Sequence, residues 1–111
     1  MKLINLTPHE INILGGSGVP TTDIPPSGSV ARLATYETLV EEIDGIPYFK
    51  QSIGRVVGLP PYESGVRYIV STAVRVHLPE RPDLASPGYP QRDENGRIIG
   101  TTGLIINEVA E

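Results

Sequence analysis

Glycine and proline recur along the whole chain and limit how long any regular element can be. The 111 residues include 12 glycines and 11 prolines. Proline removes a backbone hydrogen-bond donor, and glycine weakens helix and strand interiors. The chain is therefore predicted to fold into many turns and short elements. It has no run of 18 apolar residues, so no transmembrane helix is expected. The N-terminal residues lack the apolar core of a signal peptide, which favours a cytoplasmic location.

β-forming residues fill most of the segments between these breaks. Asp44-Gly45 is typical of a hairpin turn, with a strand on each side. Two proline-rich stretches, 19–27 and 79–91, are expected to be irregular loops, and Gly15 to Gly18 a flexible turn. The strands that we expect are 2–6, 11–14, 30–33, 35–43, 46–53 with a possible continuation to 58 after a bulge, 66–70 and 98–106.

The segment Ser71–Leu78 has two interpretations. Thr72, Val74, Val76 and Leu78 alternate as in a strand, whereas Ser71 could cap a short helix. Overall we expect an α+β fold: one small, mostly antiparallel β domain over 1–111, with one short helix (Ser71–Leu78) packed on the sheet. So small a sheet leaves edges to cover, which predicts a homo-oligomer, a dimer or larger.

Composition excludes several chemistries. The chain has no cysteine, hence no disulfide, thiolate metal site or cysteine nucleophile. Its formal charge of −4 argues against binding duplex nucleic acid. Metal-ligand spacings and a phosphate loop of the Walker type are missing. His9 and His77 could form an acid–base pair, but their 68-residue separation gives no reason to place them together. We expect no enzyme activity, metal or cofactor.

Arginine is the residue type that points to a ligand. Seven of the nine cations are arginines, and six fall in the second half of the chain. A guanidinium binds phosphate through two parallel hydrogen bonds, and aromatic rings offer faces on which bases stack. This set suits a nucleotide pocket, although surface arginines are more often solvated or paired with acids. The six are Arg55, Arg67, Arg75, Arg81, Arg92 and Arg97.

Arg92-Asp93 is the pair that we weight most. It follows a proline-rich stretch and precedes an Asn95-Gly96 turn. Arg92 would bind a phosphate, and Asp93 would accept hydrogen bonds from a ribose hydroxyl or a base edge. In the alternative interpretation, Asp93 caps its own turn and Arg92 is simply exposed.

Several short motifs together resemble a known family. They span residues 4–100 in a consistent order and spacing. The motifs are Asn5-Leu6-Thr7-Pro8-His9, Pro26-Ser27-Gly28-x-Val30-Ala31-Arg32, Asp44-Gly45-Ile46-Pro47, Gly58-Leu59-Pro60, Tyr68-Ile69-Val70-Ser71, Arg81-x-Asp83, Ser86-Pro87-Gly88 and Arg92-Asp93-Glu94-x-Gly96-Arg97-Ile98-Ile99-Gly100. The set resembles small phage and prophage proteins that include the Thoeris anti-defence proteins.

The resemblance implies a function without catalysis. Those proteins sequester cyclic ADP-ribose-type immune signals, and some also hold cyclic oligonucleotides at a separate site. By this likeness Arg92 and Asp93 would contact the ligand, and a short helix would follow the Tyr68–Ser71 motif. The ligand-binding set that we expect is Arg92, Asp93, Arg75, Arg81, Arg32 and Tyr68. The alternative function is a phage protein–protein inhibitor or a small structural or accessory protein.

Overall fold

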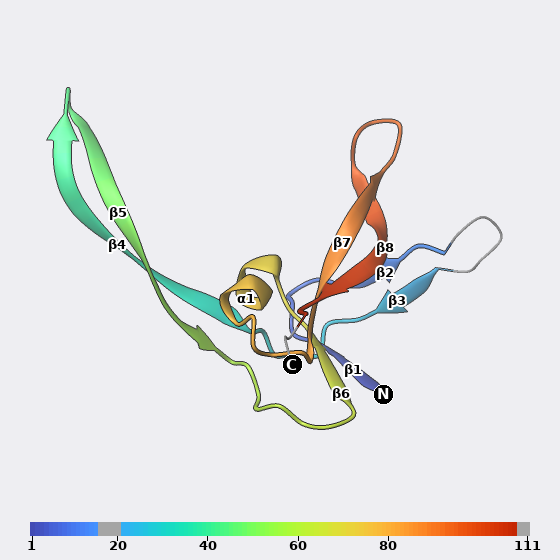
Figure 1. Ribbon diagram of the computed structural model, residues 1–111. Coiled ribbons are helices and arrows are strands. Elements are labelled where there is room, and N and C mark those ends of the chain that lie inside the picture. The colour runs from blue at the N-terminus through green and yellow to red at the C-terminus, as the bar shows by residue number, and fades with distance from the viewer. Residues whose placement is uncertain (16–20, 109–111) are drawn as a thin grey trace.

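A computed structural model describes residues 1–15 and 21–108 of the chain. Within them the elements are β1 (Lys2–Asn5), β2 (Ile11–Ile13), β3 (Thr22–Ile24), β4 (Arg32–Ile43), β5 (Ile46–Val57), β6 (Val66–Ile69), α1 (Thr72–His77), β7 (Leu84–Arg92) and β8 (Ile98–Ile106). Figure 1 shows a central body under α1, from which the β4–β5 hairpin projects on one side and the β7–β8 hairpin on the other. The expected turn over Gly15 to Gly18 lies almost wholly outside the described residues.

The strands form two sheets. Six of them follow the order β1-β6-β7-β8-β2-β3, and β4 pairs only with β5. In the larger sheet β1 and β7 run parallel to β6, and β8 runs parallel to β2, while β7–β8 and β2–β3 are antiparallel. Antiparallel pairing predominates over the two sheets together. The expected mostly-β architecture with one short helix is thus confirmed at this level.

The core lies where α1 meets the sheet. Val74, the buried residue of the helix, packs with Leu6, Tyr68, Val70 and Leu84. These side chains come from three separate parts of the chain, so burying them together fixes β1, β6 and β7 around the helix. Within the described residues, no helix has the length and apolarity to cross a membrane.

The helix settles the open choice at 71–78. Ser71 has extended backbone angles, and its Oγ accepts a hydrogen bond from the Val74 N–H at 3.3 Å. Leu78 ends the helix as its C-cap. The helical interpretation is therefore correct, because the cap supplies a partner for a backbone donor that a helix start leaves unpaired.

The β4–β5 hairpin is longer than expected. The two predicted segments 30–33 and 35–43 are one strand, and β5 continues to Val57 through a bulge, as considered from the sequence. Asp44 and Gly45 have φ values of 54° and 78°, the left-handed geometry of a two-residue turn whose twist matches the strands. We call this hairpin the arm.

Two predicted loops contain strands, which corrects the sequence interpretation. Thr22–Ile24 pairs with β2, and Leu84–Arg92 forms β7 in spite of Pro87 and Pro90. Only Leu84 and Ala85 of β7 pair with β6. Beyond them β7 pairs with β8 alone, so its other edge is open and no ladder there needs the missing proline N–H.

Candidate functional site

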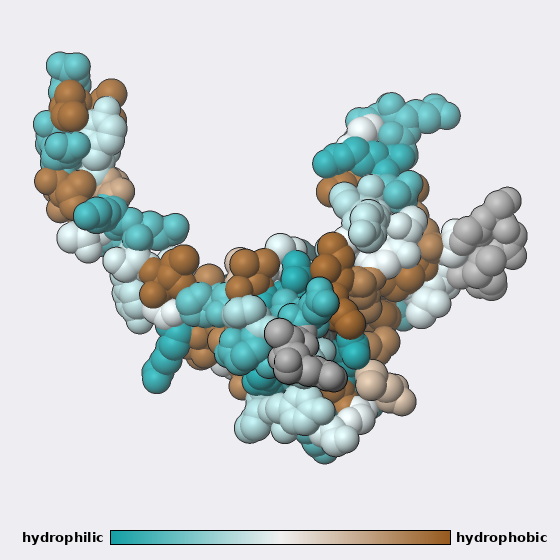
Figure 2. All heavy atoms as spheres, in the orientation of Figure 1, coloured by the Kyte–Doolittle hydropathy of each residue, from teal (hydrophilic) through white to brown (hydrophobic). Residues whose placement is uncertain are grey.

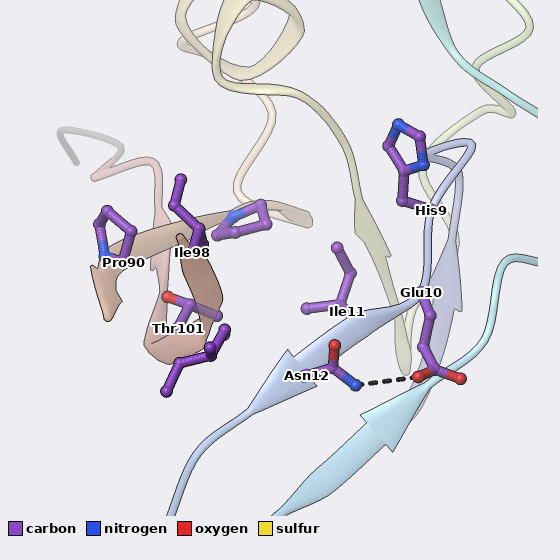
Figure 3. Close-up of a pocket in the computed structure, with 10 residues that line it drawn as sticks. His9, Glu10, Ile11, Asn12, Pro90, Ile98 and Thr101 are labelled. Atoms are coloured by element: carbon purple, nitrogen blue, oxygen red, sulfur yellow. Dashed lines mark hydrogen bonds between the residues drawn. The ribbon is translucent and has the colours of Figure 1, made fainter. Parts of the chain in front are cut away.

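A pocket of about 500 Å³ lies between β2 and the β7–β8 hairpin. This is the size range of small-molecule sites, and Figure 3 shows its lining side chains. Most of the wall is apolar, and a polar group of four occupies the rest. The apolar residues are Ile11, Pro87, Pro90, Ile98 and Ile99, and the polar ones His9, Glu10, Asn12 and Thr101; Gly100 completes the lining.

The pocket exists because β2 and β8 meet at one point and then part. Ile13 is paired with Thr101, and no further pair joins the two strands within the described chain. Gly100 allows this approach: a Cβ there would lie 2.8 Å from the Asn12 carbonyl oxygen and 2.8 Å from the Leu14 side chain. The hairpin then continues past β2, and the hollow opens between them.

The polar rim is acidic. The Asn12 amide Nδ2 donates to Glu10 Oε1 at 2.9 Å and to Asp23 Oδ1 at 2.7 Å, so two carboxylates gather at one amide. The exposed His9 ring stands on the same side (Figure 3). Carboxylates accept hydrogen bonds from sugar hydroxyls and exocyclic amines, while the isoleucines and prolines offer a surface for a ring. The pocket can thus hold an uncharged polar ring system, but it contains no arginine.

Arg92 and Asp93 lie at the tip of the β7–β8 hairpin, and neither belongs to the pocket lining. Arg92 is paired with the pocket residue Ile98, and directly paired residues point to the same face of a hairpin. Its Nη1 donates to the Gly96 carbonyl at 2.8 Å, which orients the guanidinium at an exposed position. Asp93 Oδ1 accepts from the N–H groups of Asn95 at 2.8 Å and Arg97 at 3.0 Å, so this carboxylate caps the turn.

Arg75 and Arg81 serve the body of the protein. Arg75 in α1 donates through Nε to Ser86 Oγ at 2.8 Å and through Nη1 to Asn107 Oδ1 at 3.1 Å. Arg81 makes a two-pronged contact with Asp83, at 2.8 and 2.7 Å, and also donates to the Pro60 carbonyl.

The contact between Arg81 and Asp83 changes the pKa of both groups. The hydrogen bond from Arg81 lowers the pKa of Asp83, although burial of that carboxyl opposes the change. The same hydrogen bond raises the pKa of Arg81, again against burial. Both groups stay charged, and the pair joins the 58–60 segment to the start of β7.

The remaining two expected residues are also apart from the pocket. Arg32 is exposed at the start of the arm, and Tyr68 is 3% exposed inside the core. None of the six expected residues lines the pocket; Arg92 and Asp93 are adjacent, and Arg92 is paired with the pocket residue Ile98. Arg75, Arg81, Arg32 and Tyr68 do not join them within one chain.

Sequence reasoning missed most of the pocket lining. The sequence offers His9 as an acid–base candidate and as part of the Asn5–His9 motif, and it does not indicate Glu10, Asn12 or Ile98 to Thr101 as a binding site. The available signal was that His9 and Ile98 to Gly100, which lie in the lining, each belong to one of the short motifs. No alternation or spacing rule reveals that these segments, some 90 residues apart in the chain, are neighbours in space.

No family model, curated protein or solved structure matches this chain. In residues 1–15 and 21–108, no three histidine, aspartate or glutamate side chains come together in a way that could hold a metal ion. The candidate site therefore has to be judged on its own geometry.

Proposed function

We propose that the protein is a non-catalytic binding protein that sequesters a cyclic nucleotide signal. The ligand class is a cyclic ADP-ribose isomer, with cyclic oligonucleotides as a second class, and the biological role is phage counter-defence. The observation that carries the proposal is the position of Arg92. It shares a hairpin face with Ile98, in the wall of a pocket of nucleotide size.

The parts of such a ligand match the parts of this site. A base or nicotinamide-like ring would lie against the apolar wall, and ribose hydroxyls would donate to Glu10. The pyrophosphate would lie outside the acidic rim, at the hairpin tip, where Arg92 can donate two parallel hydrogen bonds. Asp93 keeps its turn fixed through Oδ1, and its other carboxylate oxygen can accept from a hydroxyl.

Calorimetry with the purified protein tests the proposal. We expect heat of binding with at least one cyclic ADP-ribose isomer, and Arg92→Ala should weaken that binding by about 1.5–3 kcal/mol, the usual contribution of a charged hydrogen bond. Melting temperature should stay unchanged, because Arg92 is exposed. If Arg92→Ala lowers the melting temperature and leaves affinity alone, its role is structural.

Two further measurements sharpen this test. Arg55→Ala is the matched control: Arg55 is an exposed arginine on β5, which contributes nothing to the pocket lining, so affinity should not change. Heating the complex should release intact ligand, as sequestration requires; a cleaved product would indicate an enzyme. The absence of binding heat with every cyclic ADP-ribose isomer and cyclic oligonucleotide would overturn the proposal.

The alternative, a protein–protein inhibitor or accessory protein, is favoured by one observation. The arm exposes aromatic and apolar side chains such as Tyr36 and Phe49 that a partner protein could cover. Under this alternative the small-molecule titrations give no heat of binding, and a host protein co-purifies with the chain at fixed stoichiometry.

A further inference from the structure

The arm exposes apolar side chains on both of its faces. Leu39 is paired directly with Phe49, and Ile43 with Ile46 nearer the turn. Phe49 and Ile46 are three residues apart in one strand, so these two pairs point to opposite faces. Nine apolar or aromatic side chains of the arm are between 42% and 61% exposed: Tyr36, Leu39, Val40, Ile43, Ile46, Tyr48, Phe49, Ile53 and Val57.

The arm has little support of its own. Leu33 and Val56 pack against the core at its base, and the rest projects away from the body (Figure 1). The radius of gyration is 17.3 Å, compared with about 13 Å for a compact domain of about 100 residues. A lone two-stranded hairpin is only marginally stable in water. A surface that covers its apolar faces would therefore stabilise it.

We propose that the partner is a second copy of this chain, and that the arm of each copy lies in the hollow of the other. Figure 2 shows this hollow between the arm and the β7–β8 hairpin. The hairpin, its second wall, exposes Tyr89, Ile98 and Ile99. An arm inside the hollow has one face against the partner's arm and the other toward the hairpin. Both apolar faces of the arm are then covered, whereas a contact with one face alone would leave the other exposed.

The charges of the arm are complementary to themselves. Beyond Arg32, β4 carries Glu37, Glu41 and Glu42 and no cation, whereas β5 carries Lys50 and Arg55 and no acid. Within one arm these groups are not directly opposite, because Glu37 is paired with Gln51 and Lys50 with Thr38.

Two-fold symmetry brings these opposite charges together. When two arms pack face to face about an axis along their length, β4 of each lies over β5 of the other. On the face that carries Ile43 and Ile46, Glu41 of β4 and Lys50 of β5 point the same way, so Glu41 of one copy meets the strand that carries Lys50 in the other. Glu37 points to the opposite face and takes no part in this contact. This pattern favours a second copy over an unrelated protein.

The exposed area is also sufficient. A buried aromatic side chain covers about 150–250 Å², and smaller apolar side chains cover less. The nine exposed side chains of the arm are about half exposed, so covering them would bury on the order of 600 Å² of surface per copy. Two reciprocal contacts then bury about 1,200 Å², the lower limit for stable, specific interfaces. Ile98 and Ile99 also belong to the pocket lining, so the two sites adjoin. The tests below use no ligand, so failure of the arm contact is distinguishable from failure of the proposed function.

Light scattering after size exclusion tests the arm contact. At micromolar concentration we expect the wild-type chain to have twice the 12.0 kDa mass of one copy. The double variant Leu39→Ser, Phe49→Ser should weaken association by at least about 100-fold, because it removes two central apolar contacts from each copy. Tyr62→Ser is the matched control: Tyr62 is 58% exposed, compared with 60% for Phe49, and it lies in the loop between β5 and β6, on the side of the body opposite the hollow (Figure 1). It should leave the dimer intact.

A cross-linking measurement keeps the proposal testable if the double variant folds poorly. The chain has no cysteine, so introduced thiols report single positions. A mixture of Phe49→Cys and Ile99→Cys chains should give a mixed disulfide-linked dimer, because arm and hairpin of different copies meet in the hollow. Phe49→Cys mixed with Lys2→Cys should not. A monomeric wild type at about 100 µM, or a dimer that survives the double variant without the mixed cross-link, would overturn the proposal.

Discussion

At the scale of single residues, one buried amide explains the N-terminal motif. Asn5 Oδ1 accepts from the Thr7 N–H and the Thr7 hydroxyl at 2.9 and 2.7 Å, and Asn5 Nδ2 donates to the carbonyls of His9 and Ile24. These bonds fold residues 6–10 against β3 and deliver His9 and Glu10 to the pocket rim. From the sequence only a turn could be predicted here, because the partners of a buried amide depend on the tertiary fold.

The Arg81–Asp83 pair makes stability depend on acid pH. The pKa of Asp83 is lowered in the folded state, so its contribution is complete above the unfolded pKa of about 3.9 and is lost as pH falls through the lower, folded value. We expect the unfolding free energy from urea titrations to decline steeply below about pH 4. Asp83→Asn should be less stable at pH 7 and should show a shallower acid decline.

The control for this pH experiment removes a carboxylate that forms no ion pair within residues 1–15 and 21–108. Asp44 lies exposed in the turn of the arm, and asparagine suits its left-handed backbone. Asp44→Asn should therefore leave both the stability at pH 7 and the steepness of the acid decline unchanged. Equal slopes for wild type and Asp83→Asn would show that the pair does not govern acid stability.

At the scale of elements, α1 is held at its end by a residue from the far end of the chain. The Asn107 Nδ2 donates to the carbonyls of Arg75, Leu78 and Arg81 at 2.9 to 3.1 Å. Helix ends leave carbonyls unpaired, and this amide supplies the missing donor. Asn107→Ala should cost about 1–3 kcal/mol of stability in urea unfolding, since partly buried acceptors lose their partner.

Asn95→Ala is the comparison for that prediction. Asn95 is exposed in the β7–β8 turn and interacts there through its backbone N–H, so its loss should change stability by less than about 0.5 kcal/mol. Similar effects of the two substitutions would mean that Asn107 does not secure the helix.

Local signals predicted the elements that depend on local chemistry. The arm followed from Asp44-Gly45 between β-forming residues, and α1 from the Ser71 cap. Strand β7 was missed because Pro87 and Pro90 argue against a strand until one knows that its second edge is open. Whether an edge of β7 is open depends on the order of strands in the sheet, and the sequence of residues 79–91 alone does not reveal that order.

At the scale of the whole molecule, the candidate site depends on a junction between the two ends of the chain. Strand order places β2 beside β8, and the pocket opens where they part. The sequence could supply Arg92 and Asp93 as candidates, but not the other wall. For the same reason the sequence could not show that Arg75 and Arg81 are hydrogen-bonded within the body and that Tyr68 is buried there. These roles depend on the tertiary fold and not on local sequence.

Two glycines in β8 test this junction with one methyl group. In Gly100→Ala the added Cβ would lie 2.8 Å from the Asn12 carbonyl, a backbone atom that cannot turn aside, so β2 and β8 must separate. We expect a loss of about 1–3 kcal/mol in urea unfolding, as for other overpacked sites, together with weaker ligand binding in calorimetry. In Gly103→Ala the new Cβ meets nothing within 4 Å, and a strand alanine should stabilise by about 0.5–1 kcal/mol. Equal effects of the two changes would mean that contact between β2 and β8 does not build the pocket, whereas opposite signs would tie the site to the closure of the six-stranded sheet.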